Sequence, residues 1–188
     1  MPHIALGNEA SGIISLFAYR PETARPMSEL AEVLLRGPSS LSRGERELIA
    51  SYVSSLNDCE FCTTSHAAFA AAQLPEGIEL VDQVRADLDS APVSAKLKAL
   101  LRVAGAVQRS GRSVRPEDVA AARAEGATDL EVHDTVLIAA AFCMFNRYVD
   151  GLGTTLPDDP AEYAASADAI VRGGYLATLD RSEAPAEA

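Results

Sequence analysis

The chain has 188 residues, which fits one compact domain, and its 48% hydrophobic and 5% aromatic content suits closely packed helices better than a sheet. Its net charge of −11 argues against nucleic acid and anionic membrane surfaces as partners. The first residues show no basic region followed by an apolar run, and no apolar run is long enough to span a bilayer, so a cytoplasmic location is expected.

Helix start and stop signals recur along most of the chain, and no segment alternates for long between apolar and polar residues as a strand would. An all-α fold is therefore expected. A single domain over residues 1–188 is predicted, with residues 1–25 irregular, residues 26–177 helical and residues 178–188 forming a mobile tail. The predicted helices cover residues 26–35, 43–56, 59–73, 76–88, 95–110, 116–125, 129–151 and 160–176.

Capping residues indicate where several of these helices begin. Ser42 and Glu45 have the spacing of a capping box, and Thr128 and Glu131 repeat it. Asp58 is predicted to cap the helix that follows it.

The helix predicted over residues 129–151 is apolar on almost every side. One small domain does not easily cover so much apolar surface, so this helix should be buried or lie at a subunit contact. A homo-oligomer is therefore expected.

The motif richest in chemistry is the pair Cys59 and Cys62, followed by His66. Cysteines three residues apart share one face of a helix, can close a disulfide, and as thiolates can attack a peroxide or another disulfide. His66 is one turn from Cys62 but about two turns, roughly 10 Å of rise, from Cys59. Helical spacing therefore favours direct contact between His66 and Cys62.

A carboxylate can be added to this motif. Residue Glu47 lies on the preceding helix, and an antiparallel hairpin that turns at Asn57 and Asp58 would bring it level with residues 66–70. Small residues on the same face, Ala50, Ser51 and Ser54, would let the second helix approach closely. The expected relay runs from Glu47 through His66 to Cys62, with Cys59 closing the disulfide.

Other interpretations of these residues stay open. Taken alone, Glu47 would be a solvent-exposed surface residue, and the cysteines could be two buried small side chains. They could also form half of a zinc site with His66 and a fourth ligand such as His133. Structural zinc sites usually take a second closely spaced ligand pair from a separate loop, and the sequence contains no such pair. No metal is therefore expected.

Residues outside the motif have simpler interpretations. His133 lies in an otherwise apolar helix and is expected to be a core histidine, and Cys143 is expected to behave as a small hydrophobic residue. Asn146, Arg147 and Asp150 could line the site. Alternatively, Arg147 and Asp150 could pair along their helix and hold its end.

The spacing Glu47-x11-Cys59-x2-Cys62-x3-His66 resembles the alkylhydroperoxidase D-like branch of the carboxymuconolactone decarboxylase family. The resemblance covers roughly residues 13–156. Four flanking segments are similar to the members of this branch described as peroxidase-related, namely residues 19–24, 34–39, 41–47 and 145–153.

The resemblance implies an all-α, AhpD-like helical bundle that assembles as homodimers or homohexamers and requires no metal, haem or flavin. It implies that Cys62 attacks the peroxide and that Cys59 resolves the sulfenic acid as a disulfide. It also implies that Glu47 and His66 relay protons through water and Cys59, whereas helical spacing sends His66 directly to Cys62. One position departs from the pattern, because those relatives carry a histidine where this chain has Phe61.

The function expected from motif and resemblance together is a thiol-dependent alkyl hydroperoxide reductase or disulfide oxidoreductase. Its partners would be a peroxide or disulfide substrate and a dithiol reductant of the lipoyl or thioredoxin type. The alternative is a CxxC redox sensor or adaptor that does not turn over.

Overall fold

The computed structural model describes residues 1–182, with the side chains of residues 1–177 and 179, and in this part of the chain all regular secondary structure is helical, without any strand. The all-α prediction is confirmed. The helices are α1 (Gly12–Tyr19), α2 (Pro21–Arg36), α3 (Arg43–Leu56), α4 (Glu60–Ala71), α5 (Gly77–Ala86), α6 (Ala95–Arg109), the short 3₁₀ helix η1 (Gly111–Ser113), α7 (Pro116–Ala124), α8 (Asp129–Gly151) and α9 (Ala161–Ser182).

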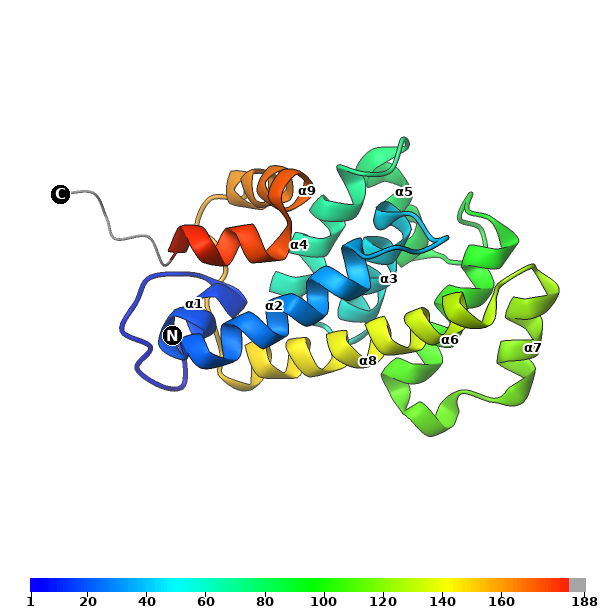
Figure 1. Cartoon of the computed structure of the whole chain (residues 1–188), viewed down its shortest axis with the longest axis horizontal. Coiled ribbons are helices and arrows are strands. Elements are labelled where there is room, and N and C mark those ends of the chain that lie inside the picture. The colour runs from blue at the N-terminus through cyan, green and yellow to red at the C-terminus, as the bar shows by residue number, and fades with distance from the viewer. Residues whose placement is uncertain (183–188) are drawn as a thin grey trace.

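Helix α3 lies at the centre of the bundle, packed against α2, α4, α5, α6 and α8. Helices α1 and α7 lie near opposite ends of the molecule, and α9 crosses over α2 and α4 (Figure 1). The core consists of aliphatic and phenylalanine side chains from these helices, and its largest fully buried members include Leu35, Leu48, Leu100, Ile138 and Phe142.

The hairpin of α3 and α4 forms as predicted, and both capping boxes are confirmed. Ser42 and Thr128 each accept a hydrogen bond from the backbone N–H three residues on, and the carboxylates of Glu45 and Glu131 accept one from the backbone N–H of the cap residue. The predicted cap Asp58 is wrong, because Cys59 is the N-cap residue of α4. Asp58 instead has φ +57°, since the tight turn between the helices needs one residue in the left-handed region, which aspartate tolerates.

The prediction that residues 1–25 are irregular is wrong for most of this segment. Helix α1 forms because Leu16 and Ser15 are buried against the rest of the molecule, a tertiary effect that no local signal announces. Helix α2 begins at Pro21 rather than Pro26, since a proline at the first helical position lacks only an N–H group that has no helical partner.

Helix α9 continues beyond its predicted end near residue 176, but Gly174 breaks it with φ +81° and ψ 179°. The two parts of α9 run in different directions on either side of this break (Figure 1). Of the tail predicted to be mobile, residues 178–182 are helical and residues 183–188 lie outside the described residues.

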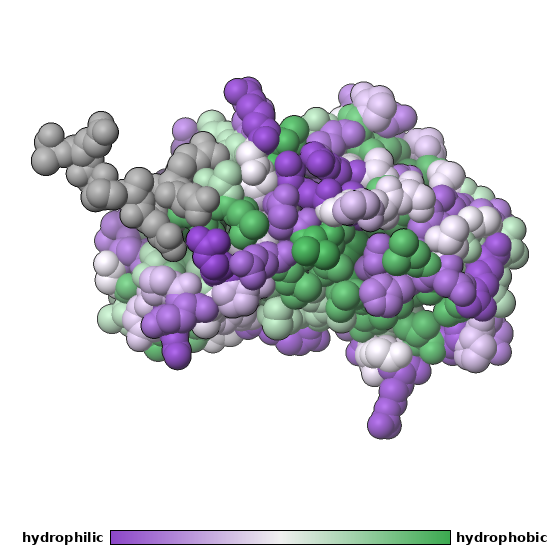
Figure 2. All heavy atoms as spheres, in the orientation of Figure 1, coloured by the Kyte–Doolittle hydropathy of each residue, from purple (hydrophilic) through white to green (hydrophobic). Residues whose placement is uncertain are grey.

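Helix α8 is less completely covered than its sequence suggests. One face buries Ile138, Phe142 and Phe145, while Leu137 and Met144 are 37% and 47% exposed. Hydrophobic atoms gather in the middle of the face shown in Figure 2, over α2 and α8. No helix within residues 1–182 is long and apolar enough to cross a membrane.

Candidate active site

The two cysteines of the motif lie side by side at the start of α4. Cys59 is the N-cap residue and Cys62 occupies the third helical position, and both are free thiols. They form a small buried cluster with Val149 of α8, in which Cys59 is 0% and Cys62 4% exposed. Unpaired N–H groups and the helix dipole favour negative charge at this end of a helix.

The surroundings move the pKa values of the two thiols in opposite directions. The hydrogen bond from Cys59 holds the pKa of Cys62 below its ordinary value despite burial, and Asn146 acts in the same direction. Interaction with Cys62, together with burial and the Asp150 carboxylate, raises the pKa of Cys59. The site therefore favours a thiolate at Cys62 beside a protonated Cys59.

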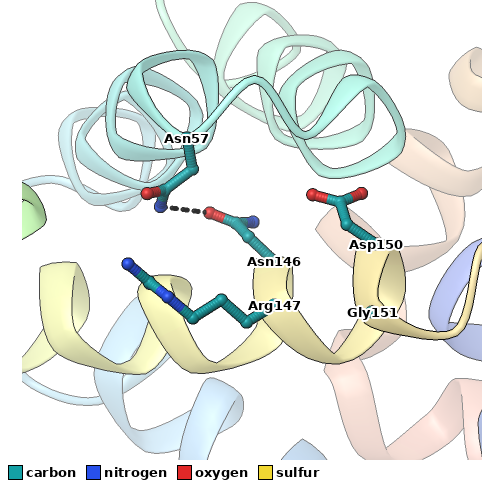
Figure 3. A pocket seen from close by; sticks show the side chains of 5 residues that line it. All are labelled: Asn57, Asn146, Arg147, Asp150 and Gly151. Carbon is teal, nitrogen blue, oxygen red and sulfur yellow. Dashed lines mark hydrogen bonds between the residues drawn. The ribbon is translucent and has the colours of Figure 1, made fainter.

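A pocket of about 400 Å³ is lined by side chains that also act on the thiols (Figure 3). It lies between the end of α3 and the last turns of α8, and Asn146 and Asp150 contribute both to its wall and to the surroundings of the thiols. The lining residues are Asn57, Asn146, Arg147, Asp150 and Gly151. The pocket is therefore lined by side chains that also surround Cys62.

A chain of amide hydrogen bonds holds Asn146 in place. Gln108 donates to Asn57 Oδ1 at 3.0 Å, Asn57 donates to Asn146 Oδ1 at 2.8 Å, and Asn146 donates to Ser54 Oγ at 3.0 Å. The oxygen of Asn146 is thus occupied by Asn57, which directs its NH₂ group into the buried side of the pocket.

The predicted pairing of Arg147 with Asp150 is not made within the described part of the chain. Arg147 Nη1 donates instead to the carbonyl of Cys143, one turn back, at 2.9 Å. Figure 3 shows the guanidinium directed toward Asn57 and away from Asp150. Both charged groups therefore line the pocket, as the first of the two sequence interpretations proposed.

The second part of the site is built around Glu47, which is 0% exposed. Its Oε2 lies 2.7 Å from His66 Nδ1, and its Oε1 accepts a hydrogen bond of 2.8 Å from the Tyr175 hydroxyl. The ring of His66 packs edge-on against Phe142 and Phe69, at centroid distances of 4.5 and 5.1 Å. The exposed position that Glu47 would have if considered alone does not occur.

The predicted direct contact between His66 and Cys62 is not made. Within residues 1–182, no hydrogen bond joins the His66 ring to either thiol, and the groups that shift the pKa of Cys62 are Cys59, Asn146 and Asp150. The physical reason is that the ring turns toward Glu47 on α3 and is fixed there by Phe142. Helical spacing fixes the position of a side chain along the helix axis, but it does not fix the side-chain conformation that its hydrogen bonds select.

Two further predictions can be compared with the structure. His133 is not a core residue, because it lies on the exposed side of α8 with Nδ1 3.0 Å from Asp134 Oδ1. It therefore cannot join the cysteines in a zinc site, and no group of three or more potential ligands is arranged around a metal position in the described residues. Cys143 is half-buried against the core and lies 3.6 Å from the Asn57 amide.

Phe61 packs between α1 and α9. Its ring contacts Tyr163 of α9 and lies so close to Gly12 that a Cβ at position 12 would collide with it. With φ +54°, Gly12 also has a backbone conformation that favours glycine. Phe61 and Ile13 of α1 both pack against the thiol cluster, so Phe61 joins α1 to it.

Sequence reasoning did not find Tyr175. It lies 128 residues from Glu47, near the predicted end of the last helix. The only local signal is the preceding Gly173-Gly174 pair, which indicates a break in the helix but not the direction that the chain takes after it.

Comparison with known proteins agrees with this architecture. Residues 21–106 match the carboxymuconolactone decarboxylase family. Among curated protein sequences, none matches this chain significantly.

Two solved structures resemble most of the chain. One is described as an alkylhydroperoxidase AhpD core, an uncharacterized peroxidase-related protein from Ralstonia eutropha JMP134; it is 26% identical with a TM-score of 0.74, covering 84% of this chain and 81% of that one. The other is an uncharacterized peroxidase-related protein from Silicibacter sp. TM1040, 26% identical with a TM-score of 0.73, covering 82% and 79%.

Proposed function

We propose that this chain is a thiol-dependent hydroperoxide reductase that uses Cys59 and Cys62, because residues 21–106 match the carboxymuconolactone decarboxylase family and the fold is alkylhydroperoxidase D-like. The observation that carries the proposal is the thiol pair itself. Two adjacent free cysteines have pKa values shifted in opposite directions, and their polar neighbours Asn146 and Asp150 line a pocket. A nucleophile and a resolving thiol need this asymmetry.

In the proposed reaction, the Cys62 thiolate attacks the terminal oxygen of a hydroperoxide. The O–O bond breaks, Cys62 becomes a sulfenic acid, and the leaving alkoxide takes up a proton as an alcohol. The sulfur of Cys59 then attacks the sulfur of Cys62, closing the disulfide and releasing water. A dithiol of the lipoyl or thioredoxin type reduces this disulfide and becomes a disulfide itself.

The Glu47–His66 pair would handle the protons of these steps. With the carboxylate at Nδ1, neutral His66 holds its proton there, and its Nε2 is the nitrogen able to accept another. Since His66 makes no hydrogen bond to either thiol within the described residues, a bridging water or a movement of the ring must complete the path. This requirement agrees with the water-mediated relay implied by the family resemblance.

The test is consumption of hydrogen peroxide and tert-butyl hydroperoxide by the purified chain with dithiothreitol as reductant. We expect the Cys62→Ser variant to lose both peroxide consumption and labelling by a sulfenic-acid reagent. The Cys59→Ser variant should form the Cys62 sulfenic acid but stop after one cycle. Cys143→Ser, which changes a cysteine outside the pair, is the matched control and should behave like the wild type.

Two results would count against the proposal. If the wild type closes the Cys59–Cys62 disulfide but consumes no more than one equivalent of peroxide with excess dithiol, it is a redox sensor or adaptor. If Cys59→Ser blocks the first oxidation while Cys62→Ser does not, the roles of the two cysteines are reversed.

A further inference from the structure

The carboxylate of Glu47 depends on two partners rather than one. A buried, ionised carboxylate is costly unless hydrogen bonds compensate for the water it has lost. His66 satisfies Oε2, and the Tyr175 hydroxyl satisfies Oε1 at 2.8 Å. Burial and the charge of Glu47 raise the pKa of Tyr175, so its hydroxyl stays protonated and acts as a donor.

The break in α9 places Tyr175 in this position. Gly174 has φ +81°, and a Cβ on it would lie 2.5 Å from Glu32 Oε2 and 2.9 Å from Arg36 Nε. A larger residue would therefore be strained and would also push Glu32 and Arg36 away from the break.

An ion pair on α2, formed by Glu32 and Arg36 and here called the α2 clamp, holds both sides of this break. Arg36 Nε donates to Glu32 Oε1 at 3.0 Å, and Arg36 Nη1 donates to the carbonyl of Ile170 at 2.7 Å, where the first part of α9 ends. Glu32 Oε2 accepts the backbone N–H of Tyr175 at 2.8 Å, where the second part begins. The Arg36 cation thus binds the C-terminal end of the first part of α9, and the Glu32 carboxylate binds the N-terminal end of the second part. Both arrangements are favourable for the helix dipoles.

We infer that Tyr175 is a positioning residue that fixes Glu47, and through it the ring of His66, and that the α2 clamp sets the place of Tyr175. The inference rests on the proposed function for the relay it serves. By occupying Oε1, the phenol leaves Oε2 to face His66 Nδ1, which keeps the ring proton at Nδ1 and leaves Nε2 as the acceptor.

The main variant is Tyr175→Phe, which removes the hydroxyl but keeps the ring beside His66 and Phe69. We expect kcat for peroxide reduction to fall about 10- to 100-fold, the scale of one hydrogen bond to a charged group, with KM unchanged. Tyr52→Phe, which alters a half-buried tyrosine outside the site on the helix that carries Glu47, should leave both quantities unchanged.

Two measurements separate positioning from general stability. In a Glu47→Gln background, Tyr175→Phe should cause almost no further loss, because the group through which it acts is gone. The ¹⁵N signals of His66 should show more of the Nε2-protonated tautomer in Tyr175→Phe than in the wild type. If Tyr175→Phe loses helicity, Glu32→Gln weakens the α2 clamp more mildly and should give the same tautomer change.

These experiments distinguish failure of the positioning role of Tyr175 from failure of the proposed peroxidase function. The tautomer measurement needs no peroxide, so a wild type without peroxidase activity but with the expected tautomer change would refute the function and support the positioning role. An active Tyr175→Phe variant with an unchanged His66 tautomer and losses additive with Glu47→Gln would overturn the inference.

Discussion

At Cys62, two neighbours act on the thiol in opposite directions. The Asn146 amide lowers the pKa of this cysteine and the Asp150 carboxylate raises it, and both side chains lie on α8 one turn apart. The pocket therefore contains both a group that favours the thiolate and a group that opposes it.

Replacing Asn146 by Ala should raise the pKa of Cys62, because the thiolate loses a hydrogen-bond donor. The rate of alkylation of Cys62 by iodoacetamide, followed by mass spectrometry as a function of pH, should then have its midpoint at higher pH than in the wild type. An unchanged midpoint would mean that the amide does not stabilise the thiolate.

Replacing Asp150 by Asn should have the opposite effect. The change is almost isosteric and removes a negative charge that opposes the thiolate, so the pKa of Cys62 should fall and the same alkylation midpoint should move to lower pH. Shifts of the same sign in both variants would indicate a general disturbance of the pocket instead of these two specific effects.

The residues of the candidate site could be predicted from sequence where they share a helix or a hairpin. Spacing along α4 relates Cys59, Cys62 and His66, and the hairpin with α3 brings Glu47 within 2.7 Å of His66. The same reasoning could not orient the His66 ring or find Tyr175. Both depend on contacts between helices distant in the sequence, which periodicity does not encode.

Among the elements, α8 has its start fixed by more than a local cap. Glu131 closes the capping box with the Thr128 N–H at 2.7 Å and also accepts hydrogen bonds from Lys96 of α6 and Ser40 of the loop before α3. Burial alone would raise the pKa of this carboxyl, but these donors prevail and lower its pKa to about 2. Glu131 therefore links the start of α8, helix α6 and the loop before α3.

Glu131→Gln should reduce the free energy of unfolding at pH 7 by about 2–3 kcal/mol, the scale of breaking a buried charged network. The folded-state pKa of about 2 lies below the ordinary value of 4.5, so the folded state binds fewer protons than the unfolded state. This stabilisation is complete above about pH 4.5 and disappears as the pH falls toward 2.

Urea unfolding of both proteins between pH 7 and pH 3 checks this prediction. The difference between wild type and variant should shrink as the pH falls, whereas Glu125→Gln, at an exposed glutamate, should track the wild type throughout. A difference that does not depend on pH would show that the carboxylate charge contributes nothing.

Helix boundaries with strong local chemistry, such as the capping boxes at Ser42 and Thr128, could be predicted closely. Helix α1 could not, because its eight residues carry no capping side chain and it is held by the burial of Leu16. The left-handed turn at Asp58 is likewise imposed by the hairpin rather than by the residue.

For the molecule as a whole, the exposed apolar surface over α2 and α8 suggests a second copy of the chain as its cover (Figure 2). Val33 of α2 is 68% exposed, and Leu137 and Met144 are exposed hydrophobic residues on α8. The two helices contact each other. Contiguous apolar surface of this kind marks association sites on soluble proteins. We propose that this face forms the contact of a homodimer, from which a hexamer could be built.

Sedimentation velocity at micromolar concentration should show a dimer or a larger assembly for the wild type. Leu137→Lys should shift the protein toward monomer, because a charge would be buried without a partner. Ile78→Lys, at a similarly exposed hydrophobic residue on α5, should leave the assembly intact. A monomeric wild type would refute the homo-oligomer prediction.

The hydrogen bond between Tyr175 and Glu47 spans 128 residues, which has a consequence for the order of events during translation. The helices that carry both cysteines and the Glu47–His66 pair leave the ribosome before Tyr175, which lies beyond helices α5, α6, α7 and α8 in the chain. A nascent chain can thus have its thiols in place while Glu47 still lacks a donor at Oε1. Helix α9, which follows all the other helices of residues 1–182, is the one that completes the hydrogen bonding of this carboxylate.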